Sequence, residues 1–298
     1  MVPSQTADAD SLEQSRMTLG EHLDELRVRL IRSTIAIAVT FAVGWSWHEV
    51  LAEVALEPYG RARVWLEVEL VEAFDEKVEA DPEITWEKYF TSADPESREL
   101  LPHVGIPEMP RGDAAGTGFF FYMRICFYFA LFVGGPVVLW QMWQFIAAGL
   151  YKNEKRALNR YFPFSAVLFL GGVVFGYFLM VPYALFFLAR MSLTQVTYWQ
   201  TIDNYLTFLT SLTLALGVVF QLPVIMLALT KVGLVEPKLF SKYRGHFIVG
   251  ALIVAALLTP PDPFTQMLMG VPIIILYELG AVLARIAYKK KADVPAVR

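Results

Sequence analysis

The chain alternates between charged segments and long uncharged segments, and the first such transition lies close to the N-terminus. Leu19, Leu23, Leu26 and Leu30 recur at steps of four, three and four, which places them on one face of a helix, with acidic and basic residues on the other. Such a helix can lie at a membrane surface and present its charges to the aqueous phase. We therefore predict an amphipathic helix over residues 17–32 that continues directly into an uncharged segment.

Six uncharged apolar segments are candidates for membrane-spanning helices. The hydrocarbon core of a bilayer is about 30 Å thick, so roughly 20 helical residues are needed to cross it. The last two segments are short, at roughly 15 to 17 residues, and would cover only about 22 to 26 Å, which predicts that they thin the bilayer locally. The six segments comprise residues 33–47, 125–151, 161–189, 204–230, 245–261 and 263–277.

The composition agrees with a membrane protein. Hydrophobic residues make up 56% and aromatic residues 14% of the 298 positions, and the mean hydropathy is +0.46. These values lie far from those of a soluble domain of this length. The first sixteen residues are polar and acidic, so no cleavable signal peptide is expected. We predict an all-α membrane protein with six transmembrane helices, formed as a single domain over residues 1–298.

Basic residues are distributed unevenly between the loops. Of the 25 Lys and Arg residues, 17 precede the first span, follow the last, or lie between spans two and three or spans four and five. Because basic loops stay on the cytoplasmic side of a membrane, both termini are predicted to be cytoplasmic. The segment between spans one and two, residues 49–117, carries 17 acidic and 6 basic residues and is predicted to lie on the opposite side.

An extracytoplasmic insertion over residues 57–118 is predicted from this acidic segment, which is rich in Glu and Pro and has few apolar runs. Short helices around residues 63–78 and 83–90 are expected, with loops elsewhere. The preferred interpretation is a solvated acidic cap, because charge alone identifies no partner. A docking surface for a passing polypeptide is the alternative.

The residue patterns of enzymes and metal sites are missing from the sequence. The four His residues are isolated, and there is no HExxH pair, GxSxG elbow or phosphate-binding glycine loop. No enzymatic activity, cofactor, metal or nucleic-acid partner is therefore expected. The spans also lack embedded charged residues of the kind that relay ions. Gln221 is the one strongly polar amide well inside a span, and both an interhelix hydrogen bond worth about 1 kcal/mol and a functional role stay open for it.

Two carboxylates at the predicted cytoplasmic edge are candidates for binding a cationic peptide. Glu25 lies in the first helix, and Glu154 follows the second span. A carboxylate at a partly desolvated boundary binds a guanidinium group bidentately. The structural alternative is ordinary, since Glu25 stands four residues before Arg29 and such a pair stabilises a helix by only about 0.3 kcal/mol. Spacing alone favours the structural interpretation for both residues.

Four motifs together resemble the TatC family, the multispanning receptor subunit of the twin-arginine protein translocase. Residues 22–30, HisLeuAspGluLeuArgValArgLeu, resemble the family's HLxELRxRL element. Residues 136–156 resemble its PxxxYQxWxFxxPxLYxxE(R/K)(R/K) element. Residues 258–266, LeuThrProProAspProPheThrGln, resemble its LTPPDxxSQ turn, and residues 277–280 its closing (F/Y)E(I/L)G. The resemblance covers roughly residues 17–60 and 119–285.

The resemblance implies a site for the consecutive arginines of a signal peptide at the cytoplasmic edge. The two acids of this site in the family correspond to Glu25 and Glu154. Arg27, Arg29 and Phe145 match family positions associated with the same recognition surface. The acids would capture the twin arginines of a folded cargo's leader, while the apolar part of the leader lies along the spans. Selectivity for Arg over Lys follows from the planar fork of the guanidinium group.

Three further positions are associated by the resemblance with transport or with a concave membrane face. Pro58 matches an outer-loop proline that is important for transport, and Gln221 and Asp262 match positions on the concave face. Gln221 stands where relatives often carry Glu, which keeps a hydrogen-bonding role open and argues against a titrating one. Ala148 stands where many relatives carry Pro, and the acidic insertion is longer than the outer loop associated with the family.

The resemblance also implies the cellular setting. A TatC-like chain is expected in the cytoplasmic (inner) membrane of a prokaryote, as a multi-pass protein in a hetero-oligomer with single-span TatA/TatB-type subunits. Its partners are twin-arginine signal peptides of folded cargo and the lipid bilayer, and the proton gradient supplies the energy.

Two other functions are weighed against this one. A secondary transporter of a small solute could place its site between six proline-broken spans. The lack of a buried charge and of an internal repeat argues against a transporter, and a membrane-embedded enzyme lacks a catalytic pair. A transporter requires a closed solute cavity, whereas a peptide receptor requires an open groove that faces lipid.

Overall fold

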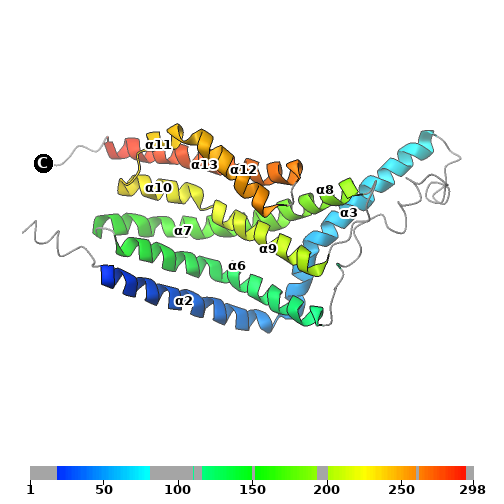
Figure 1. Cartoon of the computed structure of the whole chain (residues 1–298), viewed down its shortest axis with the longest axis horizontal. Helices are drawn as coiled ribbons and strands as arrows, with labels where there is room; N and C mark the ends of the chain where they lie inside the picture. The colour runs from blue at the N-terminus through cyan, green and yellow to red at the C-terminus, as the bar shows by residue number, and fades with distance from the viewer. Residues whose placement is uncertain are drawn as a thin grey trace, which may run out of the picture.

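The protein forms an elongated bundle of helices in the computed structural model (Figure 1). The structure describes residues 19–80, 110, 116–149, 152–192, 201–259 and 262–292. Within these residues every regular element of the fold is helical. Most of the helices lie side by side along the long axis, and one helix crosses obliquely at one end of the bundle.

The elements follow one another in this order: α2 (Leu19–Trp45), α3 (His48–Ala80), α6 (Thr117–Ala148), α7 (Lys152–Phe175), the π-helix η1 (Gly176–Met180), α8 (Val181–Ser192), α9 (Ile202–Val219), α10 (Leu222–Val232), α11 (Pro237–Lys242), α12 (Arg244–Leu258) and α13 (Pro263–Ala292).

Four helical segments of the described chain are long and apolar enough to cross a membrane, and this makes the protein a multi-pass membrane protein. The second of them joins α7, η1 and α8, and the third joins α9 and α10. A shorter apolar helix, α12, accompanies them. The four long segments are Thr117–Ala148, Arg160–Met191, Ile202–Val232 and Pro263–Tyr288.

The first helix, α2, joins the predicted amphipathic stretch and the first apolar segment without a break, as expected from Leu19 onward. Residues 17 and 18 of the predicted helix lie outside the described residues. Leu23 and Leu30 on its leucine face are each 64% exposed, so this face is not packed against the rest of the chain. The helix instead packs along α6, where Gly134 lies close to Ile37 and Thr40.

The prediction that the last span is short is wrong. α13 is 30 residues long, because Glu278 and Arg285 do not end the helix after Tyr277. Glu278 instead pairs with Arg244 at the start of α12, with 2.6 Å between its Oε1 and the arginine Nε. The expectation of a short fifth helix holds, since α12 has 15 residues. Only α12 therefore favours local bilayer thinning.

The segment after the first span also differs from the prediction. α3 is one continuous helix of 33 residues, with Pro58 in its interior. The helix expected around residues 63–78 lies within α3, which begins earlier than expected, at His48. Ala, Leu, Val and Glu residues on both sides of Pro58 favour helix, and the backbone carbonyl group that proline leaves unpaired finds a partner elsewhere. The expected helix over residues 83–90 lies outside the described residues.

The segment of α7 and η1 and the helix α9 approach each other through glycines. A Cβ atom on Gly172 of α7 would lie 2.6 Å from the backbone oxygen of Leu216 in α9, and one on Gly176 would lie 3.0 Å from the Cα atom of Thr213. Glycines spaced four apart are a common means of close helix packing in membranes. The main core continues from this crossing toward α3, with Tyr59, Leu185 and Leu206 buried in it.

The closing motif of the sequence, residues 277–280, holds α13 in place. The Tyr277 hydroxyl donates a hydrogen bond of 2.6 Å to the Phe240 carbonyl oxygen in α11, and its ring stacks on Phe247 of α12 at 3.9 Å. A Cβ atom on Gly280 would lie 3.0 Å from the Cα atom of Pro223 in α10. This motif therefore has a structural explanation within the bundle.

Candidate functional site

The N-terminal end of α2 lies beside the C-terminal end of α6 (Figure 1). The ring of His22 stacks on the ring of Phe145, with centroids 4.4 Å apart and planes inclined by 23°. Gly149, which follows α6, lies next to the same imidazole. The motif at residues 22–30 and the end of the motif at residues 136–156 are thus brought together by packing.

Glu25 and Arg29 form an ion pair on this end of α2. The Arg29 Nε–H donates to Glu25 Oε1 at 2.7 Å, and Nη2 lies 2.5 Å from the same oxygen. Arg29 Nη1 also donates to the side-chain oxygen of Gln141 in α6, at 3.1 Å. The two charged side chains are only 18% (Arg29) and 23% (Glu25) exposed, so the pair is partly shielded from water. The i, i+4 pairing anticipated from spacing is confirmed.

The other two candidates at this end have different surroundings. Arg27 is exposed on α2. Glu154 belongs to the first turn of α7, which begins shortly after α6 ends, while its side chain lies outside the described residues. The structure therefore brings Glu25, Arg29 and Phe145 to one end of two packed helices and places the backbone of Glu154 in the adjoining turn.

A carboxylate already bound by a guanidinium group is a site where another guanidinium group can bind. Charge-assisted Arg–carboxylate pairs are stronger than neutral hydrogen bonds, and partial burial reduces competition from water. Gln141 offers Arg29 a second acceptor, so Arg29 has a partner when Glu25 is occupied otherwise. The arrangement suits exchange of one arginine for another.

Gln221 lies in a buried polar network between three helices. Its side-chain nitrogen donates to the Ser165 carbonyl oxygen at 3.0 Å, and its side-chain oxygen accepts a short hydrogen bond from the Ser165 hydroxyl. Trp143 Nε1–H donates to the same hydroxyl at 2.9 Å. Gln221 is 2% exposed, so it lies between helices and not on an open face of the chain. The expected interhelix hydrogen bond is confirmed.

Asp262 forms the N-terminal cap of α13. Its Oδ1 accepts from the Thr265 backbone N–H at 2.7 Å, and its Oδ2 accepts a short hydrogen bond from the Thr265 hydroxyl. Pro58 lies in α3 and is buried. Asp262, Pro58 and Gln221 each have separate partners, and the structure does not bring them into one cluster.

Several residues at these sites were not singled out from the sequence. His22 and Gln141 contact the candidate residues directly, and both fall inside motifs that were recognised as whole elements. Ser165 and Trp143 complete the network of Gln221. Trp143 also falls inside the motif at residues 136–156, whereas Ser165, an isolated serine in an apolar span, gives no sequence signal. The tertiary contacts were needed to find them.

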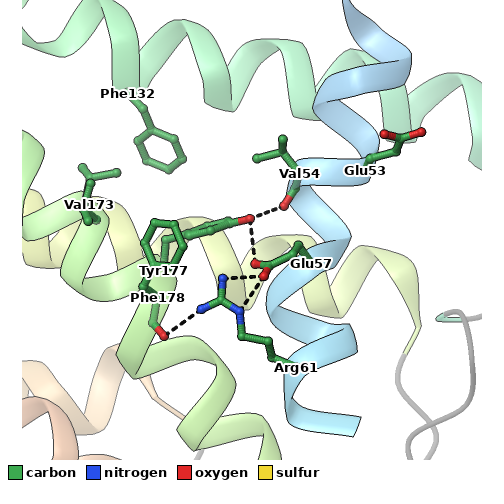
Figure 2. A pocket seen from close by; sticks show the side chains of 9 residues that line it. Glu53, Val54, Glu57, Arg61, Phe132, Val173, Tyr177 and Phe178 are labelled. Carbon is green, nitrogen blue, oxygen red and sulfur yellow. Dashed lines mark hydrogen bonds and ion pairs between the residues drawn. The ribbon is translucent and has the colours of Figure 1, made fainter. Parts of the chain in front are cut away.

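Two apolar grooves open on the surface of the bundle. The first has a volume of about 550 Å³ and lies between α3, α6 and η1, with Phe132, Val173 and Phe178 in its walls (Figure 2). The second has a volume of about 590 Å³ and lies between η1, α8 and α13, with Leu179 and Met267 in its walls. Phe178 and Leu179 are 44% and 46% exposed, so both grooves open to the surroundings of the chain.

Comparisons with known proteins identify the chain's relatives. The family model described as Sec-independent protein translocase protein (TatC) matches residues 21–272. A TatC protein of Aquifex aeolicus is 30% identical over 280 residues, which cover 93% of this chain and 99% of the relative. A TatC protein of Escherichia coli K12 is 36% identical over 185 residues, which cover 60% of this chain and 72% of the relative.

Solved structures agree with the sequence comparison. A crystal structure described as the twin arginine translocase receptor TatC matches with a TM-score of 0.64 at 27% identity, and the match covers 89% of this chain and 99% of that one. The family match spans most of the chain, and the fold, the motifs and the relatives agree. The chain therefore belongs to the TatC family of Sec-independent protein translocase proteins, which are membrane subunits of a translocase and not enzymes.

Proposed function

We propose that this chain is the receptor subunit of a twin-arginine translocase and that it binds the paired arginines of signal peptides where α2 meets the α6–α7 connection. The family supports the receptor role, since structural relatives carry the description of twin arginine translocase receptor. The geometry supports the location, because this end gathers the two most specific motifs of the sequence.

The observation that carries the proposal is the ion pair of Glu25 and Arg29. A partly buried carboxylate bound to a guanidinium group shows that the site accommodates an arginine side chain. In the proposed mechanism, an arginine of the signal peptide displaces Arg29 from Glu25, and Arg29 keeps its hydrogen bond to Gln141. A lysine side chain reproduces this two-nitrogen contact poorly, because its ammonium group lacks the planar fork of a guanidinium group.

Three further residues complete the proposed site. Glu154 would bind the second arginine from the adjoining turn of α7. Arg27, exposed beside Glu25, would contact the peptide backbone or its acidic residues. Phe145, stacked on His22, would hold the end of α6 against α2 so that both acids face the same peptide.

The topology and partners of the protein follow from the charge distribution and the family. Six spans with both termini in the cytoplasm would place the proposed site on the cytoplasmic face of a prokaryotic inner membrane. Pro58, Gln221 and Asp262 would serve transport by holding the helices around the membrane groove. Single-span TatA/TatB-type subunits would assemble on this scaffold, and the proton gradient would drive transport.

Peptide binding tests the proposed site. The purified protein in nanodiscs is titrated with a signal peptide carrying two arginines and with its paired-lysine variant. We expect the paired-arginine peptide to bind at least about tenfold more tightly, because each charge-assisted bond contributes about 1.5 to 3 kcal/mol. Glu25→Ala and Glu154→Ala should each weaken arginine binding and reduce this selectivity.

Asp24→Ala is the matched control, since it removes one exposed acid from the same turn of α2. It should leave both affinities nearly unchanged. Equal affinity for the two peptides, unaffected by substitution of Glu25 or Glu154, would contradict the proposed site. That result would return the two acids to a structural role and favour the solute transporter.

Topology is tested separately by labelling introduced cysteines in a Cys126→Ala background. Gln14→Cys and Val297→Cys should react with a membrane-impermeant maleimide only from the cytoplasmic side. Ser97→Cys should react only from the opposite side. Labelling of the two termini from different sides would contradict an even number of spans.

A further inference from the structure

A proline in α3 leaves a backbone carbonyl group without its helical partner. Pro58 has no N–H group, so it cannot donate to the oxygen of Val54 four residues earlier. The hydroxyl of Tyr177, in η1, donates to this oxygen at 2.5 Å (Figure 2). The same hydroxyl lies 3.2 Å from Glu57 Oε2. A side chain of the third span therefore replaces the hydrogen bond that Pro58 removes from α3.

A second proline produces the reverse arrangement. Pro182, in the first turn of α8, has no N–H group, so the preceding turn, which holds the oxygen of Phe178 in the π-helix η1, lacks one backbone donor. Arg61 of α3 donates from Nη1 to this oxygen at 3.3 Å, and its guanidinium carbon lies 4.6 Å from the centroid of the Phe178 ring. Glu57 holds the guanidinium group in place through a hydrogen bond from Nε at 2.5 Å. Each helix thus supplies the donor that the proline of the other helix removes.

A neighbouring hydrogen bond also connects α3 to α9. The hydroxyl of Tyr205 in α9 donates to the Ala55 carbonyl oxygen of α3 at 2.5 Å, and its ring meets the ring of Tyr59 edge to face at 5.4 Å. Both tyrosines are almost fully buried. A backbone carbonyl group that has no helical partner is usually paired with a side chain or with water. The proline-opened turn of α3 takes these partners from η1 and α9.

We propose that Pro58, Tyr177, Arg61 and Pro182 form a reciprocal clasp that fixes α3 on the third span and that transport requires it. Tyr177 and Arg61 are positioning residues in this proposal. The helix α3, which carries Arg61, crosses the bundle at the end opposite the N-terminal end of α2 (Figure 1), so the clasp lies apart from the proposed peptide site. The inference goes beyond the proposed receptor function, because it concerns a step that follows signal-peptide binding.

A double-mutant cycle tests the first half of the clasp. Tyr177→Phe removes the donor and leaves the Val54 oxygen unpaired, which should lower the melting temperature of the purified protein by about 2 to 4 °C. Pro58→Ala restores an N–H group that can bond to Val54 within the helix. In the Pro58→Ala background, Tyr177→Phe should therefore cost less than half as much. Equal losses in the two backgrounds would overturn the clasp.

A second double-mutant cycle tests the contact between Arg61 and the turn before Pro182. Arg61→Met keeps the length of the side chain but removes its donors, and Pro182→Ala restores an N–H group opposite the Phe178 oxygen. Arg61→Met should cost less in the Pro182→Ala background, and Arg61→Lys should restore part of the loss in the wild-type background. Tyr183→Phe is the control for loss of a tyrosine hydroxyl, since Tyr183 lies exposed on the same span. Additive effects of Arg61→Met and Pro182→Ala would overturn this half.

Two functional readouts separate positioning from general loss of fold. Tyr177→Phe and Arg61→Met should bind the paired-arginine peptide with wild-type affinity, while export of a folded reporter with a twin-arginine leader falls at least about threefold. Wild-type export by both variants would overturn the required role in transport. Failure of the wild-type protein to bind the peptide would contradict the proposed receptor site instead, and the two stability cycles would still decide the clasp.

Discussion

At the scale of single residues, Gln221 is a polar group inside the bundle whose partners lie on another helix. Gln221 satisfies its amide with Ser165, and Ser165 also accepts from Trp143. The network ties α6 and α7 to the break between α9 and α10, where Pro223 begins the next helix. A neutral amide suits this place, because a charged side chain with 2% exposure would lose its hydration.

Gln221→Glu should make stability depend on pH. Burial disfavours the charged carboxylate, so the introduced acid is tolerated in the folded state only while it is protonated. The variant should therefore match the wild type most closely near pH 4 and lose stability as pH rises, because the unfolded state ionises first. Melting temperatures measured between pH 4.5 and 8 check this. A wild-type pH profile in the variant would contradict the dry environment assigned to Gln221.

The structural role of Asp262 is to cap the N-terminus of α13, where its carboxylate accepts the Thr265 backbone N–H. Asp262→Ala should lower the free energy of unfolding by about 1 kcal/mol, because the Thr265 N–H loses its acceptor. Asp262→Asn keeps an acceptor oxygen and should cost only a few tenths of that amount. Denaturant titration in detergent measures both. Equal losses for the two variants would show that the negative charge, and not capping, is what matters at this position.

At the scale of elements, close packing of α7 against α9 depends on which glycine of α7 faces α9. Gly171 and Gly172 are adjacent in the sequence, yet only Gly172 faces α9. A Cβ atom on Gly171 would meet nothing within 4 Å, whereas one on Gly172 would collide with backbone atoms of Leu216 and Gly217. Backbone atoms cannot move aside without separating the helices.

Gly172→Leu should therefore be severely destabilising, and Gly171→Leu should be nearly neutral or slightly stabilising. Overpacking of a tight interface commonly costs about 1 to 3 kcal/mol or more, and exposed Leu in a membrane-facing position carries no such cost. The folded fraction after purification in detergent and the melting temperature measure the difference. Similar behaviour of the two variants would contradict the α7–α9 crossing.

At the scale of the whole molecule, the outer ends of the helices are joined by charged pairs as well as by the clasp. Arg190 of α8 pairs with Glu69 of α3 at 2.8 Å, and Arg124 of α6 pairs with Asp203 of α9 at 2.6 Å. These side chains are half exposed, so each pair is expected to contribute less than about 1 kcal/mol. The buried interior therefore carries most of the cohesion of the bundle.

The thiol of Cys126 can be used to measure how tightly the bundle is packed. Cys126 is the single cysteine of the chain and has 0% exposure inside the bundle. N-ethylmaleimide should leave it unlabelled in the folded protein and label it fully after denaturation in hot detergent. Gly172→Leu, which separates two spans, should raise the labelling rate severalfold, and Gly171→Leu should not. Rapid labelling of the folded wild-type protein would contradict the packing around α6.

Much of the fold could be predicted from the sequence because it depends on local composition. Uncharged runs of sufficient length specified the apolar helices, and the spacing of Glu25 and Arg29 specified their ion pair. The prediction that the last span ends at Tyr277 was wrong, and the helix expected around residues 63–78 begins earlier, at His48. Glu278 and Pro58 are accommodated inside helices only because Arg244 and Tyr177, far away in the sequence, satisfy the charge and the carbonyl group.

The sequence by itself determined that this protein is helical and membrane-embedded, and its motifs determined its family. The tertiary structure decided which polar groups are partners, including Gln141 with Arg29, Ser165 with Gln221 and Tyr177 with Val54. The physical reason is the range of the forces involved. Hydrophobic segment length and helical spacing act between near neighbours in the chain. A buried donor or acceptor, in contrast, must find a partner wherever packing places one, and no local pattern records where that is.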